Sequence, residues 1–134
     1  MKNVEFLQYG ANKLIEVAYH SPFPEEFRGR ILYVCPFCLY YFTNKFELEV
    51  HSEICTVRCP PGDEIYRDDN FSIFEVDARK EKQYSLNLCY ISNCYLDHKY
   101  LNVDISLFNF YVLCERNRDK HGLFMCGYFS KVRN

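Results

Sequence analysis

The chain alternates short apolar and aromatic runs with polar, turn-forming residues, a pattern that predicts mostly short strands. Residues 4–9 and 14–19 are two β-rich runs on either side of residues 10–13, which have turn chemistry. We therefore expect a hairpin at the start of the chain. Residues 20–24 contain two prolines, which cannot donate to a strand ladder, so the hairpin should end there.

Further strands are expected along the rest of the chain, each bounded by polar or turn-forming residues. They are expected at residues Ile31–Val34, 64–67, Phe71–Asp77, 101–105, 108–115 and 123–129. The polar residues 116–122 should form the hairpin loop between the last two strands. The sequence contains no internal repeat and no low-complexity segment.

One long helix is expected over residues 85–98, after a charged connector at residues 78–83. Leu88, Ile91 and Tyr95 fall at helical spacing and should give this helix one buried stripe. The segment is rich in β-branched and aromatic residues, so tertiary packing must hold it rather than intrinsic propensity.

The amino-acid composition is typical of a globular protein and agrees with the strands and helix expected from the pattern. Hydrophobic residues make up 49% and aromatic residues 18% of the 134 residues, enough for one domain with a core. The formal net charge of −2 gives no overall field that would attract nucleic acid or an acidic membrane. No apolar run has the length of a membrane span, and the first residues lack the apolar centre of a signal peptide.

The sequence contains eight cysteines and four histidines, and three of the cysteines and one of the histidines have the spacing of a zinc site. Cys35, Cys38, His51 and Cys55 form the pattern C-x2-C-x12-H-x3-C. Thiolates and imidazole are the ligands that tetrahedral zinc prefers, and a closed set of four indicates a structural ion. His51 and Cys55 lie four residues apart and should point from one face of a helix. With these ligands present, we expect a reducing intracellular compartment rather than disulfides.

The segment between the two halves of this pattern should be the helix that carries His51. Asn44 can cap it, and Glu47 lies three residues later, where it can complete a capping box. Phe46, Leu48 and Ile54 are expected to supply apolar surface that packs around the metal.

The remaining cysteines need a separate interpretation. Cys59 is a possible competitor of Cys55 for the metal, but only Cys55 shares a helical face with His51. The other four lie in apolar helix or strand contexts, where cysteine usually packs as a small hydrophobic residue. They are Cys89, Cys94, Cys114 and Cys126.

A series of motifs in a fixed order resembles the opening half of the catalytic domain of the MYST histone acetyltransferases, from Lys2 to Lys131. The motifs are Lys2-Asn3-Val4, Ser21-Pro22-Phe23-Pro24-Glu25-Glu26-Phe27, the metal spacing, Pro60-Pro61-Gly62-Asp63-Glu64-Ile65-Tyr66, Phe74-Glu75-Val76-Asp77, Asn87-Leu88-Cys89, Leu96-Asp97-His98-Lys99 and Gly127-Tyr128-Phe129-Ser130-Lys131. The resemblance implies an α+β fold. Residues 1–62 would be a β-hairpin plus a C2HC zinc-finger lobe. Residues 63–134 would be the first half of a truncated GNAT-type acetyltransferase sheet with one main helix.

The resemblance also implies a function. Members of the family move an acetyl group from acetyl-CoA to a lysine of a histone or another nuclear protein. Histone tails and subunits of a histone acetyltransferase complex would be the partners, and the location would be nuclear. The family's structural zinc would be held by Cys35, Cys38, His51 and Cys55, and Lys99 matches the lysine that members acetylate on themselves.

The catalytic parts of the family are missing from this sequence. Its five glycines form no Gly-x-Gly loop, which in the family opens the helix that holds the pyrophosphate of acetyl-CoA. The glutamate that acts as general base is also missing. We therefore expect no catalytic residue, no cofactor-binding residue and no activity in these 134 residues alone.

Two alternative functions follow from the same residues. The first is a non-catalytic, zinc-containing protein-binding module. The second is a nucleic-acid-binding zinc finger, but the metal-bearing helix carries Glu47, Glu49 and Glu53 against Lys45 alone. Phosphate contact needs cations, so this helix argues against direct DNA binding.

Overall fold

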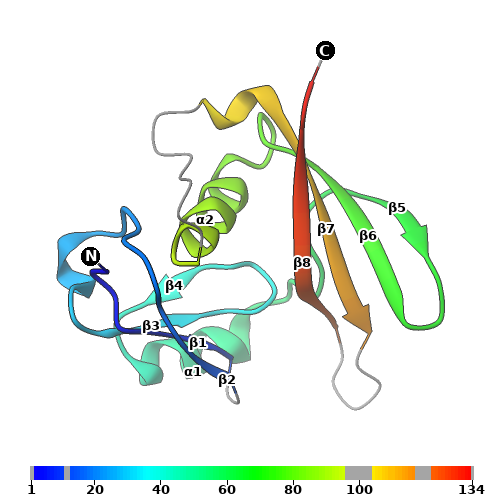
Figure 1. Ribbon diagram of the computed structural model, residues 1–134. Helices are drawn as coiled ribbons and strands as arrows, with labels where there is room; N and C mark the ends of the chain where they lie inside the picture. Colours follow the sequence, from blue (N-terminus) through cyan, green and yellow to red (C-terminus); the bar gives the residue numbers. More distant parts are fainter. Residues whose placement is uncertain (1, 11–12, 96–103, 117–121, 134) are drawn as a thin grey trace.

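A computed structural model describes residues 2–10, 13–95, 104–116 and 122–133, which form two four-stranded sheets and two α-helices (Figure 1). The first sheet has the order β2-β1-β3-β4. Its strands are β1 (Phe6–Tyr9), β2 (Lys13–Glu16), β3 (Ile31–Val34) and β4 (Tyr41–Phe42). The protein is therefore a mixed α+β fold, as the sequence predicts.

The first sheet combines the expected hairpin with a pairing that the sequence pattern does not reveal. β1 and β2 pair antiparallel, which confirms the hairpin, although both strands are shorter than expected. β1 also pairs parallel with β3, so that Leu7 lies opposite Leu32, and both side chains are fully buried. The connection between β1 and β3 contains a short 3-10 helix, Glu25–Phe27, whose Phe27 is buried.

The second sheet is an antiparallel meander with the order β5-β6-β7-β8. Its strands are β5 (Asp63–Arg67), β6 (Phe71–Asp77), β7 (Phe108–Arg116) and β8 (Leu123–Val132). Burial alternates along β6, with Ser72, Phe74 and Val76 on the covered face. The four expected strands of this part of the chain are confirmed, and β8 runs three residues further than predicted.

The strand expected at residues 101–105 is wrong in the part that the structure describes. Residues 101–103 lie outside the described residues, and Asp104 precedes a 3-10 helix, Ile105–Leu107. The Asp104 carboxylate accepts hydrogen bonds from the Ser106 backbone amide and hydroxyl, at 3.0 and 2.7 Å. This local capping competes with an extended backbone and explains the turn.

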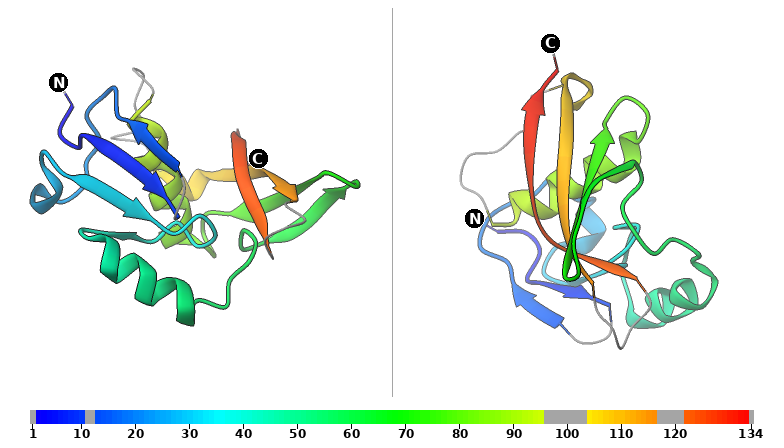
Figure 2. Two further views of the ribbon diagram at one scale, coloured as in Figure 1. Left: turned by 90° about the horizontal axis from the view of Figure 1, so that it is seen from below. Right: turned by 90° about the vertical axis from the view of Figure 1, so that its right-hand side faces the viewer.

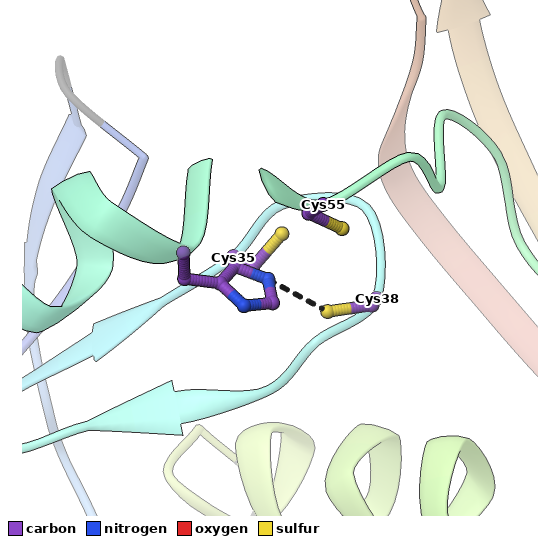
Figure 3. Close-up of side chains that lie close together, drawn as sticks. Cys35, Cys38 and Cys55 are labelled. Atoms are coloured by element: carbon purple, nitrogen blue, oxygen red, sulfur yellow. Dashed lines mark hydrogen bonds between the residues drawn. The ribbon is translucent and has the colours of Figure 1, made fainter. Parts of the chain in front are cut away.

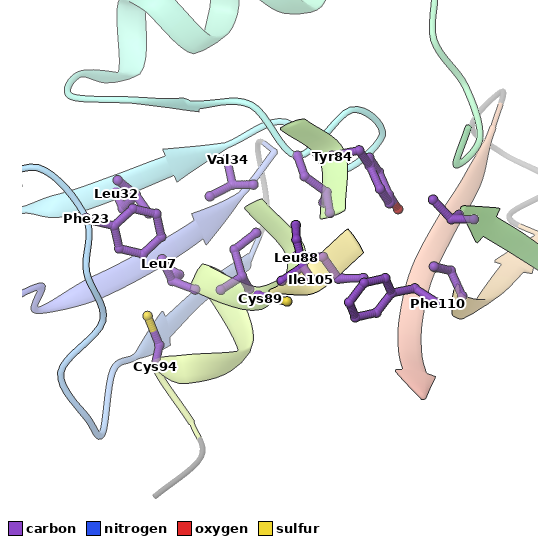
Figure 4. Packing of buried hydrophobic residues seen from close by; sticks show 14 of the residues in the cluster. Leu7, Phe23, Leu32, Val34, Tyr84, Leu88, Cys89, Cys94, Ile105 and Phe110 are labelled. Atoms are coloured by element: carbon purple, nitrogen blue, oxygen red, sulfur yellow. The ribbon is translucent and has the colours of Figure 1, made fainter. Parts of the chain in front are cut away.

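The main helix, α2 (Lys82–Asn93), lies between the two sheets (Figures 1 and 4). It begins within the segment that was expected to be a connector, and residues 96–98 of the expected helix lie outside the described residues. Leu88 and Ile91 are buried as predicted, but the single buried stripe is wrong. Buried residues occur on several sides of the helix, because it packs against a sheet on each side. They are Tyr84, Ser85, Asn87, Leu88, Cys89, Ile91 and Asn93.

One hydrophobic core runs through both sheets and α2 (Figure 4). Leu7 and Val34 enter it from the first sheet, Leu88 from α2 and Phe110 from the second sheet. The Ser21 hydroxyl also donates a 2.6 Å hydrogen bond to the Tyr90 carbonyl, which ties α2 to the first half of the chain. The two halves therefore stabilise each other. Neither helix in these residues is long and apolar enough to cross a bilayer.

Among the described residues, β8 lies at one edge of the second sheet, and this edge leads to a prediction about association. β8 has a hydrogen-bonded neighbour on one side, β7, and carries the exposed Phe129 and Val132. Exposed apolar edge strands template pairing with other chains. We expect the purified 134-residue chain to associate as its concentration rises, as measured by sedimentation velocity.

The variant Phe129→Lys should reduce this association, because a charged edge resists pairing. Leu107→Lys is the matched control, since Leu107 is comparably exposed but lies outside the sheet edge. A monodisperse monomer at all concentrations would contradict the prediction.

Candidate metal centre

Four side chains from two adjoining elements converge beside the first sheet (Figure 3). Cys35 directly follows β3, Cys38 ends the turn after it, His51 lies in α1 (Lys45–Ile54), and Cys55 is the C-cap of α1. Their ligand atoms all lie within 4.8 Å of one another, and Cys38 Sγ lies 3.3 Å from His51 Nε2. The structure thus brings together the four residues that the spacing singles out. Three thiols and one imidazole are a donor set that suits a tetrahedral zinc ion.

The turn that carries both cysteines of the first pair is closed by its own backbone. The Cys35 amide donates to the Tyr40 carbonyl at 2.9 Å, and the Leu39 amide donates to the Cys35 carbonyl at 3.0 Å. Leu39 adopts a positive φ of 62°, a conformation that costs energy for a residue with a side chain. Its side chain is fully buried in the core, which holds the turn in place.

Capping sets the start of α1 and thereby the position of His51. The Asn44 side chain accepts a 2.8 Å hydrogen bond from the Glu47 amide, as predicted. The return contact differs from a capping box, because Glu47 Oε1 accepts from the Asn44 side-chain amide at 2.6 Å rather than from its backbone. At the other end, the Cys55 amide donates to the His51 carbonyl, which keeps these two ligands one turn apart.

The apolar packing expected around the metal is correct for only one of the three residues. Leu48 is buried, whereas Phe46 is 71% and Ile54 73% exposed. Leu48, His51 and Cys55 follow one another at spacings of three and four residues and so occupy the inward face of α1. Phe46 and Ile54 lie on the opposite face, and their expected role in packing is wrong.

The cysteine turn also contacts the second sheet through Phe37. The Phe37 ring packs against Phe124 of β8, with centroids 4.8 Å apart, and the Arg58 guanidinium lies 5.1 Å from its centroid. The Leu123 amide donates to the Arg58 carbonyl at 2.8 Å beside this contact. The candidate centre is therefore joined to both sheets. Nothing in the sequence pattern singles out Phe37 apart from its place between two ligands.

The environment of the turn favours a thiolate at Cys35. The Cys38 thiol donates a hydrogen bond to Cys35, and the Cys38 and Phe37 backbone amides add to it, which lowers the pKa of Cys35. The same pairing raises the pKa of Cys38. Metal ligands must be deprotonated, so a preformed thiolate suits cation capture.

Both parts of the chain match family models. Residues 1–55 match the MYST family zinc finger domain, and residues 59–134 match the MOZ/SAS family. The chain belongs to the MYST family of histone acetyltransferases.

Curated MYST relatives resemble the whole chain. Histone acetyltransferase of the MYST family 2 from Arabidopsis thaliana is 46% identical over 135 residues, covering 100% of this chain and 30% of the relative. Histone acetyltransferase esa1 from Emericella nidulans is 46% identical, covering 99% of this chain and 26% of the relative. Histone acetyltransferase mst1 from Schizosaccharomyces pombe is 42% identical, covering 99% and 28%. The chain thus spans between 26% and 30% of the length of these relatives.

The other cysteines of this MYST chain lie apart from the four-residue cluster. Cys59 packs against the hydrophobic core, so the geometry favours Cys55 as the fourth donor. Burial raises the pKa of Cys89 to about 11 and that of Cys114 to about 12, which suits neutral packing thiols.

Cys126 is exposed, so its expected packing role is wrong. The register between β7 and β8 shifts at this point: Leu113 pairs with Gly127 and Cys114 with Met125. Cys126 is the extra residue of this bulge and has no opposite partner, which explains its exposure. Lys99, which the resemblance leads us to expect as a self-acetylated lysine, lies outside the described residues.

Proposed function

We propose that Cys35, Cys38, His51 and Cys55 hold one structural zinc ion. The support is a complete set of four soft or borderline donors, gathered within 4.8 Å from a closed backbone turn and a capped helix. A closed set leaves no position for substrate or water, so the role is structural rather than catalytic. The ion would join β3, the cysteine turn and α1 into one unit.

We further propose that the chain is the first part of a catalytic domain that transfers acetyl groups from acetyl-CoA to histone lysines in the nucleus. Residues 1–62 would be its zinc lobe, and residues 63–134 the first half of its GNAT-type core. The observation that carries this proposal is the pair of consecutive MYST family matches, residues 1–55 and 59–134. Histone tails and subunits of an acetyltransferase complex would be its partners, and Lys99 its self-acetylated position.

A chimera tests whether this chain can serve as that part of an enzyme. The matching 135-residue stretch of the Arabidopsis relative would be replaced by this chain, which is 46% identical to it. We expect the chimera to acetylate a histone peptide within about tenfold of the parent rate, a loss of no more than roughly 1.4 kcal/mol in transition-state stabilisation.

Two variants of the chimera make the result interpretable. His51→Ala should abolish activity by unfolding the zinc lobe, whereas Cys59→Ala should leave it nearly unchanged, because Cys59 lies outside the cluster. A folded chimera without activity would overturn the proposal for the acetyltransferase domain, and zinc analysis of the same samples would still test the metal site.

The 134 residues alone are expected to have no acetyltransferase activity. A lysine amine is mostly protonated at neutral pH and needs a base, and the sequence lacks the family's general base and Gly-x-Gly loop. Intact-mass measurement after incubation with acetyl-CoA should therefore show no enzymatic acetylation of Lys99. A gain of one acetyl group that disappears in Lys99→Arg would contradict this prediction.

A further inference from the structure

The outer face of α1 carries an apolar stripe that nothing in the metal centre uses. Phe46, Val50 and Ile54 are spaced four residues apart and so line one face of the helix. They are 71%, 45% and 73% exposed. Val57, just beyond the helix, is exposed as well. Figure 2 shows α1 at the periphery of the molecule.

Carboxylates border the stripe. Glu49 and Glu53 are adjacent to it along one flank, and Glu47 lies on the other flank. All three are exposed, and Glu47 is engaged in the helix cap. Among the residues that the structure describes, no cation pairs with Glu49 or Glu53. Within α1, Lys45 is the one lysine or arginine near this face, and it lies at the start of the helix.

We propose that this face of α1, defined as Phe46, Glu49, Val50, Glu53 and Ile54, docks a basic amphipathic helix of a partner protein. Apolar residues of that helix would cover Phe46, Val50 and Ile54, as in recognition modes in which a helix presents anchors at spacings of three and four residues. Its lysine or arginine residues would face Glu49 and Glu53. Aromatic side chains such as that of Phe46 are enriched in the cores of protein interfaces.

Charge disfavours the other occupants of an exposed apolar helix face. A second copy of this chain would bring its own α1 against the stripe. In an antiparallel pair Glu49 and Glu53 would meet their equivalents, and in a parallel pair they would meet Glu47, so both arrangements oppose like charges. Nucleic acid and anionic lipid surfaces are repelled by the same carboxylates. A cationic protein segment is the occupant whose chemistry complements both parts of the face.

The docking proposal does not depend on acetyl transfer, and binding measured on the zinc-loaded 134-residue chain tests it separately from the chimera. The chain would be labelled at its N-terminal amine and kept at nanomolar concentration, which limits association through β8. The probe is a synthetic amphipathic helix with leucines along one face and lysines beside them. A companion peptide has the same leucines and glutamates in place of the lysines.

We expect the basic peptide to bind and the acidic peptide to bind at least about tenfold more weakly. Phe46→Ala and Ile54→Ala should each weaken binding of the basic peptide by about tenfold or more. Leu14→Ala and Ile65→Ala are matched controls, because both residues are exposed and lie on other elements, and they should leave binding unchanged. The double variant Glu49→Lys with Glu53→Lys should reverse the preference between the peptides, whereas Glu26→Lys should not.

Three results would contradict the proposal that this face docks a basic helix. Equal binding by the parent, Phe46→Ala and Ile54→Ala chains would overturn the proposal, provided that zinc content shows the variants to be folded. A dimer in sedimentation that Phe46→Ala disrupts would assign the face to a second copy of the chain. Binding to vesicles of anionic lipid that Ile54→Ala abolishes would assign it to a membrane surface instead.

Discussion

Replacing His51 with alanine is expected to remove the metal from the protein and to unfold the segment from β3 to the end of α1. Structural zinc contributes on the order of 10 kcal/mol to the folding of small metal-dependent units, a value comparable to the whole stability of a domain. Without the ion, the three remaining thiols, those of Cys35, Cys38 and Cys55, would depend on the backbone hydrogen bonds of the cysteine turn and of the end of α1. Elemental analysis should find one zinc per parent chain and none in the variant.

Hydrogen exchange should locate this loss. Amides of Ile31–Val34 and Lys45–Ile54 should lose more protection than those of Phe71–Asp77, because β6 is paired on both sides away from the centre. Cys59→Ala is the matched control and should keep both the zinc and the protection, since Cys59 lies outside the cluster. A His51→Ala chain that binds zinc as tightly as the parent would contradict the proposed ligand set.

Replacing Gly62 with alanine is expected to destabilise the protein by at least about 3 kcal/mol. Gly62 has a φ of +138°, and a Cβ atom placed on it would lie 2.2 Å from the Glu75 carbonyl oxygen. That oxygen belongs to β6, at the point where Asp63 of β5 pairs with Glu75. The substitution therefore adds backbone strain and forces the two strands apart. Urea denaturation of the zinc-loaded protein measures the change.

Two other glycines separate these contributions. Gly29 has a φ of +70° with open space around it, so Gly29→Ala should show the backbone strain alone, about 1 kcal/mol. Gly127 has neither a positive φ nor a close neighbour, and Gly127→Ala should be nearly neutral. If Gly62→Ala costs no more than Gly29→Ala, the close approach to β6 is not a source of destabilisation.

Local patterns were sufficient where the physical cause is local. The spacing of Cys35, Cys38, His51 and Cys55 predicts a turn and a helix face that meet, and the structure places these four side chains together. The Asn44 cap depends on residues three apart and is confirmed. The strands of the second sheet follow from alternation and from the polar turns between them, and consecutive antiparallel pairing needs no distant partner.

Features that depend on contacts between residues far apart in the chain could not be predicted from local sequence patterns. The parallel pairing of β1 with β3 joins segments separated by β2 and a 3-10 helix, so no local pattern specifies it. The helical pattern predicts one buried stripe on α2, but α2 packs between two sheets, so more of its circumference is buried than in a helix that covers one sheet from the solvent side. The apolar sequence context of Cys126 predicts a packing residue, but the register shift between Leu113 and Cys114 makes Cys126 the extra residue of a bulge, and its side chain is exposed.

The sequence by itself thus determined the candidate ligands, the family and most of the elements, since each is encoded in residue types at short, fixed spacings. The tertiary structure decided which apolar residues of α1 are buried. Phe46, Leu48 and Ile54 are equally apolar in sequence, yet only Leu48 is buried. The convergence of His51 and Cys55 on the cysteine turn orients the helix, and that orientation leaves Phe46 and Ile54 exposed to solvent.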